Sequence, residues 1–313
     1  MFEKILKELT DHQTIILHRH HHPDGDALGS QIGLKHLILK NLPGKRVLTV
    51  GDAAGRYAFM ADSAMDEVDD SEYPVALAVI LDTSAKSLIS DDRYRKAHRT
   101  VRLDHHLFVE KIADVEVTDS SFESCCGLVT AMAEEFGWDL TAEAATALYT
   151  GMVTDSGRFR YDATNSRTFR LAAKLAEQPI DTEKLYRDLY AVDLKELRLR
   201  AAFINRIKLS PKGVAYIRTT KDELDELQCD SFTASRGMVS VMADLRGVDI
   251  WVNFTETDQG ILCELRSGPF NINPIAVKYG GGGHAKASGA TLKNWDEANS
   301  MLNDLDQMAG KQV

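Results

Sequence analysis

The segment TIILHRHHHPDGDALGS, residues 14–30, combines an apolar run, a loop rich in histidine and aspartate, and the start of a helix. The apolar run at 14–20 is typical of a buried strand, and Pro23 ends regular strand pairing. A helical pattern begins near Ala27. This order predicts one strand-loop-helix unit with metal-capable side chains at the carboxyl end of its strand.

The same alternation of strands and helices continues along the first half of the chain. Further strands are expected at 45–50, 74–82 and 99–104, and helices at 27–40, 124–136, 141–152 and 165–178. Continuous apolar strands separated by helices favour an α/β fold, a parallel sheet with helices on both faces. Ligands of such sheets bind beyond the carboxyl ends of the strands.

The length of 313 residues predicts two domains, because it exceeds the usual size of one. We expect an N-terminal domain over residues 1–186 and a charged connector helix over 187–209. Residues 210–313 are expected to form a smaller α+β domain. Its strands are predicted in VAYIRTT, VDIWVNFTET and GILCELRS, and its last helix begins near Trp295.

The composition excludes several classes of protein. A net charge of -10 disfavours tight binding to long nucleic acid, which requires many cationic side chains. The most continuous apolar run, VALAVIL, is far shorter than the roughly 20 residues of a membrane span, and the N-terminus lacks the pattern of an export signal. The four cysteines show no C-x-x-C spacing. We therefore expect a cytoplasmic protein that binds no membrane, and the sequence leaves a homodimer open.

Acidic and histidine residues recur where predicted elements end. They stand in HHHPDGD (His20, Asp24, Asp26), VILDTS (Asp82), RLDHHL (Asp104, His105, His106) and MVTDSGRF (Asp155). Each segment alone has an ordinary explanation, since Asp82 suits a helix N-cap and Asp-Gly-Asp suits a turn. Together they would place several carboxylates at one end of a sheet, where their repulsion is relieved by divalent cations.

The order of these motifs resembles the DHH phosphoesterase superfamily, named for the triplet that stands here at 104–106. The segment from His20 fits the H-x-x-P-D-x-D pattern of that superfamily, and GGGGHAKASGA at 280–290 looks like the signature of its DHHA1 companion domain. The resemblance covers nearly the whole chain. It is greatest to the stand-alone branch of oligoribonucleases (nanoRNases) and pAp phosphatases.

The resemblance implies a binuclear metal site. One ion would be held by His20, Asp24 and Asp82, and the other by Asp26, Asp82, His105 and Asp155. His106 would face the substrate phosphate, and Asp104 would hold a neighbouring imidazole. Carboxylate and imidazole ligands favour two Mn(II) ions, with Mg(II) or Co(II) as alternatives.

Three further histidines, His18, His21 and His22, fall outside the motif. We expect them around the ligands or facing solvent, with a contact to the substrate as a second interpretation.

The glycine-rich segment of the second domain is a candidate for binding the substrate. Glycines permit positive φ and a close approach of the backbone to an anion, although a flexible connection would use the same residues. With the resemblance, the candidate contacts are Arg266, Ser267, Gly281, Gly282, Gly283 and His284.

The leading hypothesis is a Mn-dependent phosphodiesterase. It would hydrolyse very short RNA, such as pApA, to 5′-mononucleotides and remove the 3′-phosphate of pAp. A phosphodiesterase for cyclic di-AMP or pApA signalling is an alternative in the same class. A family-II inorganic pyrophosphatase is disfavoured by the GGGGH segment, and a nucleotide-binding regulator without turnover is disfavoured by Asp82 and Asp155.

Overall fold

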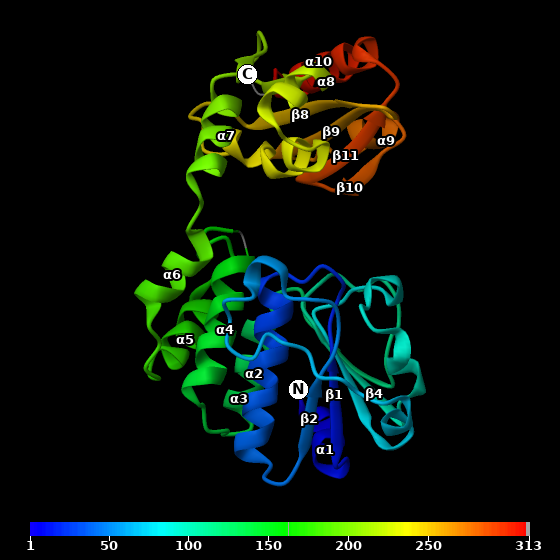
Figure 1. The fold of residues 1–313 in the computed structure, drawn as a ribbon, viewed down its shortest axis with the longest axis vertical. Helices are drawn as coiled ribbons and strands as arrows, with labels where there is room; N and C mark the ends of the chain where they lie inside the picture. Colours follow the sequence, from blue (N-terminus) through cyan, green and yellow to red (C-terminus); the bar gives the residue numbers. More distant parts are fainter. Residues whose placement is uncertain (162, 311–313) are drawn as a thin grey trace. The chain divides into compact units, whose positions relative to one another are not determined.

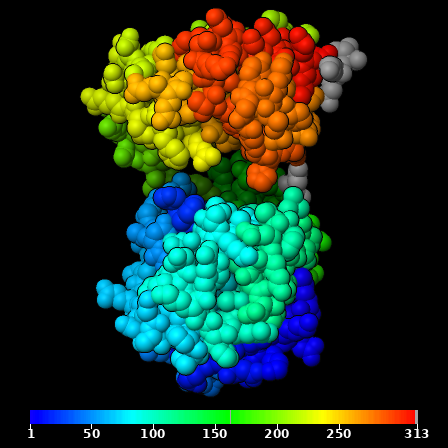
Figure 2. Space-filling view, turned by 90° about the vertical axis from the view of Figure 1, so that its right-hand side faces the viewer, coloured from blue at the N-terminus to red at the C-terminus, as the bar shows by residue number. Residues whose placement is uncertain are grey.

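The computed structural model describes residues 1–161 and 163–310 of the chain. The chain divides into two compact units, Met1–Ala191 and Val192–Val313. Each unit is continuous in sequence, so the colours run from blue to green in one and from yellow-green to red in the other (Figure 1 and Figure 2). The expected domain end at residue 313 lies outside the described residues. No helix within the described part combines the length and apolar character that a membrane span requires.

The N-terminal unit is built on a five-stranded parallel sheet, which confirms the expected α/β class. The strand order is β2-β1-β3-β4-β5, and the order reverses between β1 and β3. The strands are β1 (Thr14–His18), β2 (Arg46–Thr49), β3 (Leu77–Leu81), β4 (Arg99–Asp104) and β5 (Val115–Thr118). The α-helices are α1 (Glu3–Asp11), α2 (Gly25–Asn41), α3 (Cys125–Glu135), α4 (Ala142–Asp155), α5 (Ser166–Leu175) and α6 (Thr182–Tyr190).

The two faces of this sheet are covered differently. The α-helices α2 to α5 gather on one face (Figure 1), where Ile15, Leu17 and Val79 belong to the main core. On the other face Ile16 packs with Tyr73 and Ile80 with Tyr94. These tyrosines lie on the 3-10 helices η2 (Asp70–Val75) and η4 (Asp92–Lys96). Right-handed crossovers require the chain from β2 to β4 to pass over this second face.

Helices α2 and α4 pack closely because glycines line their contact. A Cβ atom at Gly29 would lie 2.5 Å from the carbonyl oxygen of Ala147, and one at Gly151 would lie 2.9 Å from Oδ1 of Asp26. Distances this short are excluded for any side chain. The close approach brings the start of α2 beside the end of α4.

The C-terminal unit is an α+β domain with a six-stranded mixed sheet of order β10-β11-β9-β8-β7-β6. Within the described residues, β7 and β8 pair in parallel and the other four pairs are antiparallel. Its strands are β6 (Lys208–Leu209), β7 (Ala215–Thr219), β8 (Ile250–Thr257), β9 (Gly260–Ser267), β10 (Gly282–His284) and β11 (Ala287–Leu292). Its α-helices are α7 (Leu194–Ile204), α8 (Lys221–Leu227), α9 (Asn273–Lys278) and α10 (Trp295–Ala309).

The connector helix expected over 187–209 is not one helix. Helix α6 ends at Tyr190, and Ala191 is extended, with ψ 130°. Asp193 then starts α7, because its carboxylate accepts a hydrogen bond of 2.8 Å from the Glu196 N–H. Helix α7 ends at Ile204, and its Phe203 is fully buried in a core of the C-terminal unit. The charged pattern concealed this cap, so the continuous helix was a wrong expectation.

Candidate metal centre

The acidic and histidine side chains come from the carboxyl ends of three neighbouring strands. His20 lies just beyond β1, Asp82 directly follows β3, and Asp104 is the last residue of β4. Because these strands are adjacent and parallel, their ends lie at one edge of the sheet, where its order reverses. The ends of α2 and α4 add Asp26 and Asp155.

The first group of side chains contains His20, Asp24 and Asp82. The His20 Nε2 atom lies 3.8 Å from Oδ1 of Asp24 and 3.5 Å from Oδ2 of Asp82. One ligand atom from each residue lies within 4.8 Å of the others, which is compatible with a shared cation. The Nδ1 atom of His20 is 2.8 Å from the His21 carbonyl, so the ring donates there and directs Nε2 toward the carboxylates.

The second group centres on His105. Its Nε2 atom lies 3.8 Å from Asp26 Oδ2, 3.4 Å from Asp155 Oδ2 and 3.5 Å from Asp82 Oδ1. Its Nδ1 atom donates to the Phe122 carbonyl at 3.3 Å. The two oxygens of Asp82 therefore face different histidines, one in each group.

Asp82 has the features of a ligand whose partner is a cation. Its side chain is buried, and its Oδ1 atom has no hydrogen-bond partner among the described residues. Its φ of 49° lies in the left-handed region, which non-glycine residues rarely adopt. An unpaired buried carboxylate oxygen is costly, and a divalent ion would satisfy it. The residues present thus fit a metal.

The electrostatics of the carboxylates support the same conclusion. Burial, together with the charges of Asp82 and Asp155, raises the pKa of Asp26 well above its usual value. Burial and the Asp82 charge also raise the pKa of Asp155, to about 7. Cations at this position would reverse the effect and keep the carboxylates ionised at neutral pH.

Asp104 is buried and links two side chains. The Arg102 guanidinium donates to its Oδ2 atom, and Nδ1 of His106 donates to its Oδ1 atom at 2.7 Å. The bond to Asp104 raises the pKa of His106 to about 9. His106 also lies 3.6 Å from Asp82 and is more exposed than His105.

Asp26 is held by a contact that the sequence did not reveal. The backbone N–H groups of Cys125 and Cys126 donate to its two oxygens, at 2.7 and 2.9 Å. These groups stand at the start of α3, where unpaired N–H groups favour an anion. The partners lie about 100 residues apart, so no local pattern could have shown the contact.

A buried arginine, also missed from the sequence, fixes the segment that carries His20. The Arg19 guanidinium is fully buried and donates to the His20 carbonyl at 3.1 Å and to Asp52 Oδ1 at 2.9 Å. Asp52 also accepts from the His22 N–H at 2.7 Å and from the Ser90 hydroxyl at 2.7 Å. Arg19 and Asp52 thus hold the backbone on both sides of His21.

The three extra histidines are members of neither group. His18 is fully buried beside the Tyr73 and Tyr94 rings, and burial lowers its pKa to about 4. His21 and His22 are exposed. Of the two expectations, solvent exposure describes His21 and His22, whereas His18 belongs to the interior.

The candidate substrate contacts lie in the C-terminal unit, where most of them line one pocket of about 810 Å³. Arg266, Gly281, Gly282, Gly283 and His284 line it. Ser267 does not, because alternation along β9 turns it to the core face, and its hydroxyl accepts the Phe270 N–H at 2.9 Å. A contact of Ser267 with the substrate stays a prediction.

The glycine run is part of a β-hairpin. Gly282 and Gly283 pair with Gly289 and Ser288 across β10 and β11, and Gly283 has a φ of 132°. The Gly281 N–H donates to the Ala276 carbonyl at 2.9 Å, so that amide is engaged within the protein. Close strand packing therefore accounts for part of the glycine content.

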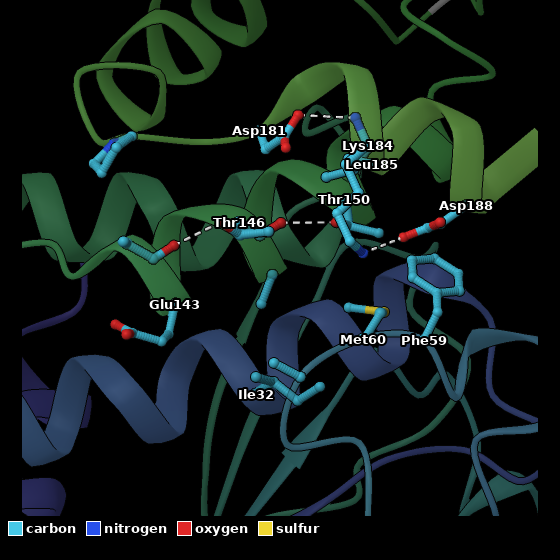
Figure 3. Close-up of a pocket in the computed structure, with 14 residues that line it drawn as sticks. Ile32, Phe59, Met60, Glu143, Thr146, Thr150, Asp181, Lys184, Leu185 and Asp188 are labelled. Carbon is cyan, nitrogen blue, oxygen red and sulfur yellow. Dashed lines mark hydrogen bonds and ion pairs between the residues drawn. The ribbon is translucent and has the colours of Figure 1, made fainter.

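Another pocket, of about 310 Å³, lies between α2, α4 and α6 (Figure 3). Its polar groups bond to each other: Lys184 donates to Asp188 at 2.5 Å, and Thr150 to the Thr146 carbonyl at 2.7 Å. Within the described part of the chain, no residue of the metal-capable groups lines this pocket. The pocket is therefore distinct from those groups.

Known protein families match a segment in each of the two units. Residues 14–152 match the DHH family, N-terminal domain, and residues 231–311 match the DHHA1 domain. The bifunctional oligoribonuclease and PAP phosphatase NrnA of Bacillus subtilis is 33% identical, over 98% of each chain. The protein of the same name from Mycoplasma genitalium is 33% identical, over 93% of this chain and 92% of that protein. An exopolyphosphatase-related protein from Bacteroides fragilis has a crystal structure with a TM-score of 0.87 at 25% identity, covering 99% of this chain and 97% of that one.

Proposed function

The chain belongs to the DHH family, with a DHHA1 domain in its second unit, and from this membership we propose that it is a metal-dependent phosphodiesterase and 3′-phosphatase. Its proposed substrates are very short RNA, such as pApA, and pAp. The relatives named as bifunctional oligoribonucleases and PAP phosphatases, which it matches over nearly its full length, support this assignment. The single observation that carries it is Asp82, whose two oxygens face His20 and His105.

We propose that these groups hold two Mn(II) ions. One would be held by His20, Asp24 and Asp82, and the other by Asp26, Asp82, His105 and Asp155. When bound, such ions supply an activated water and neutralise charge on the phosphate oxygens. Mixed carboxylate and imidazole ligands favour manganese over magnesium.

The chain's own residues have separate tasks in this proposal. His106, held by Asp104 at 2.7 Å and more exposed than His105, donates a hydrogen bond to the substrate phosphate. Arg266 and His284 bind the substrate in the pocket of the C-terminal unit. Both substrates require cleavage between phosphorus and a 3′-oxygen, so one set of residues serves both reactions.

The test is hydrolysis of pApA and pAp by the purified protein, with Mn(II) and after EDTA treatment. We expect release of 5′-AMP from both substrates with Mn(II) and its loss in EDTA. Absence of turnover of both substrates with Mn(II), Mg(II) and Co(II) would contradict the proposal. Cyclic di-AMP and pyrophosphate, measured alongside, distinguish the alternative phosphodiesterase and pyrophosphatase activities.

A homodimer and a cytoplasmic location stay predictions. Sedimentation of the purified protein measures the first, and cell fractionation the second.

A further inference from the structure

The pocket of the C-terminal unit carries an aromatic side chain beside its cations. Phe232, Arg236, Glu264 and Arg266 all line this pocket of about 810 Å³. The Phe232 side chain is 66% exposed, although a phenylalanine gains free energy when it is covered. The Arg236 guanidinium carbon lies 6.0 Å from the centre of the Phe232 ring. The pocket therefore offers an apolar ring face and positive charge to one ligand.

The strand β9 explains how the charged residues reach the pocket. Leu262, Glu264 and Arg266 alternate with Cys263 and Leu265, which lie in the core beneath. The side chains of Leu262, Glu264 and Arg266 therefore lie on the face of the strand opposite to the core.

Glu264 connects the two arginines of the pocket. Its Oε1 atom accepts from Arg236 Nε at 3.1 Å, and its Oε2 atom accepts from Arg266 Nη1 at 3.0 Å. One carboxylate shared by two guanidinium groups leaves a net positive charge. Each guanidinium has further N–H groups, which can bind phosphate.

Hydrogen bonds from a buried side chain of the sheet fix the backbone of the segment that carries Phe232 and Arg236. This segment contains the single-turn π-helix η5 (Thr233–Gly237). Such turns are rare in proteins overall, and those that occur are often found at functional sites. The buried Asn253 amide donates to the carbonyls of Ala234 and Ser235 at 2.6 and 3.0 Å. Phe232 is therefore exposed on a fixed backbone.

We propose that Phe232 is the platform on which a nucleobase of the substrate stacks, and that Glu264 positions Arg236 and Arg266 for its phosphate. This inference rests on the proposed function and adds the base-binding group to it. A nucleotide is the ligand that combines an aromatic plane with anionic groups, which matches the pocket. The negative charge of the whole chain disfavours an anionic lipid surface as the occupant.

Stacking also predicts the specificity. Every base has an aromatic face, so a platform tolerates all bases but favours nucleotides over phosphate esters without a base. The protein should therefore hydrolyse pAp more efficiently than ribose 3,5-bisphosphate, which lacks the adenine.

The experiment compares Phe232→Ala and Phe232→Tyr with the unchanged full-length protein. We expect Phe232→Ala to raise KM for pApA and pAp about tenfold, with kcat little changed, because stacking binds the ground state. Phe232→Tyr should restore KM. Rates on ribose 3,5-bisphosphate should be the same for all three proteins. Phe169→Ala removes a ring that is 55% exposed in the other unit and serves as the matched control.

The outcomes separate this inference from the proposed function. If the unchanged protein fails on both pApA and pAp, the proposed function is wrong. If it cleaves them and Phe232→Ala has an unaltered KM, the platform is wrong. If Phe232→Ala also slowed the hydrolysis of ribose 3,5-bisphosphate to the same degree, stacking would be overturned. Phe232 would then affect the site in general and not the binding of a base. Circular dichroism of each variant checks folding.

Discussion

Asp82 combines a left-handed backbone with a buried, unpaired oxygen. Asparagine tolerates the same backbone and has nearly the same shape, so Asp82→Asn removes the charge with little change in fold. We expect this variant to lose at least 100-fold in Mn(II) affinity and in the rate of pApA hydrolysis, because both proposed ions lose a ligand. Calorimetric titration with Mn(II) measures the first and product release the second. A near-normal Mn(II) affinity and rate for Asp82→Asn would show that Asp82 is not the shared ligand. The control is Asp70→Asn, which changes a carboxylate of an exposed ion pair.

Asp52 fixes the backbone of the segment that carries His20, through its bonds to Arg19 and to the His22 N–H. The Asp52→Ala variant leaves Arg19 without its carboxylate and removes the acceptor of the His22 N–H. We expect Mn(II) affinity to fall about tenfold, as for other groups that orient metal ligands. Asp92→Ala changes an exposed carboxylate of the same region and should leave the affinity unchanged. Equal affinities for both variants would contradict a positioning role.

His18 makes stability depend on pH. Burial lowers its pKa from 6.5 to about 4, so the unfolded chain binds a proton more readily than the folded one. The free energy of unfolding should therefore be fully retained above pH 6.5 and should fall as the pH decreases toward 4. The contribution is at most about 3 kcal/mol, from 1.36 kcal/mol per pKa unit.

The variant His18→Leu tests this dependence, because leucine is apolar and has no group that takes up a proton. Urea unfolding at pH 7 and pH 4.5, in EDTA to remove any metal, gives the free energies. The unchanged protein should lose more stability than His18→Leu between these values. Parallel losses in the two proteins would assign the pH dependence to other groups.

At the scale of elements, the contact of α2 with α4 joins the two helix ends that carry Asp26 and Asp155. In Gly29→Ala, the new methyl group would lie 2.5 Å from the backbone oxygen of Ala147, which cannot move without α4. We expect a loss of about 1–3 kcal/mol in stability, together with weaker Mn(II) binding.

Thermal unfolding and Mn(II) titration measure both effects of Gly29→Ala. The control is Gly268→Ala, where a Cβ atom meets no other atom within 4 Å. A stable Gly29→Ala protein with normal Mn(II) affinity would show that the helices separate without disturbing the ligands.

The elements that could be predicted are those with a strong local pattern. The apolar runs of β1, β3 and β4 end at polar residues, and this places His20, Asp82 and Asp104 at one edge of a parallel sheet. Alternation along β9 turns Ser267 to the core face, and the predicted substrate contacts stay predictions.

The remaining features depend on tertiary contacts, which leave no periodic signal in the sequence. The Arg19–Asp52 pair and the hydrogen bonds from α3 to Asp26 join distant segments. The break at Ala191 occurs where the N-cap Asp193 competes with continued helix, and the charged pattern of the segment is the same in either case.

At the scale of the whole molecule, each unit has its own hydrophobic core. The main core of the N-terminal unit lies on one face of the parallel sheet and includes Leu17 and Val79, and a core of the C-terminal unit contains Val252 and Leu265. All six proposed metal ligands lie within the unit Met1–Ala191. A ligand stabilises only the folding unit that binds it, unless the units unfold together.

We therefore expect Mn(II) to raise the unfolding temperature of the N-terminal unit alone. At 100 times the dissociation constant the stabilisation is about 2.7 kcal/mol, equivalent to roughly 5–10 °C for a unit of this size. Calorimetry of the full chain, with Mn(II) and with EDTA, measures the shift, and hydrogen exchange assigns each transition to its residues. Asp82→Asn should abolish the shift, whereas Phe232→Ala should retain it. An equal rise of the unfolding temperature of the C-terminal unit with Mn(II) would have two explanations: the two units unfold together, or the ions bind outside the proposed ligands. In the first case Asp82→Asn abolishes the rise, and in the second case the rise persists in Asp82→Asn.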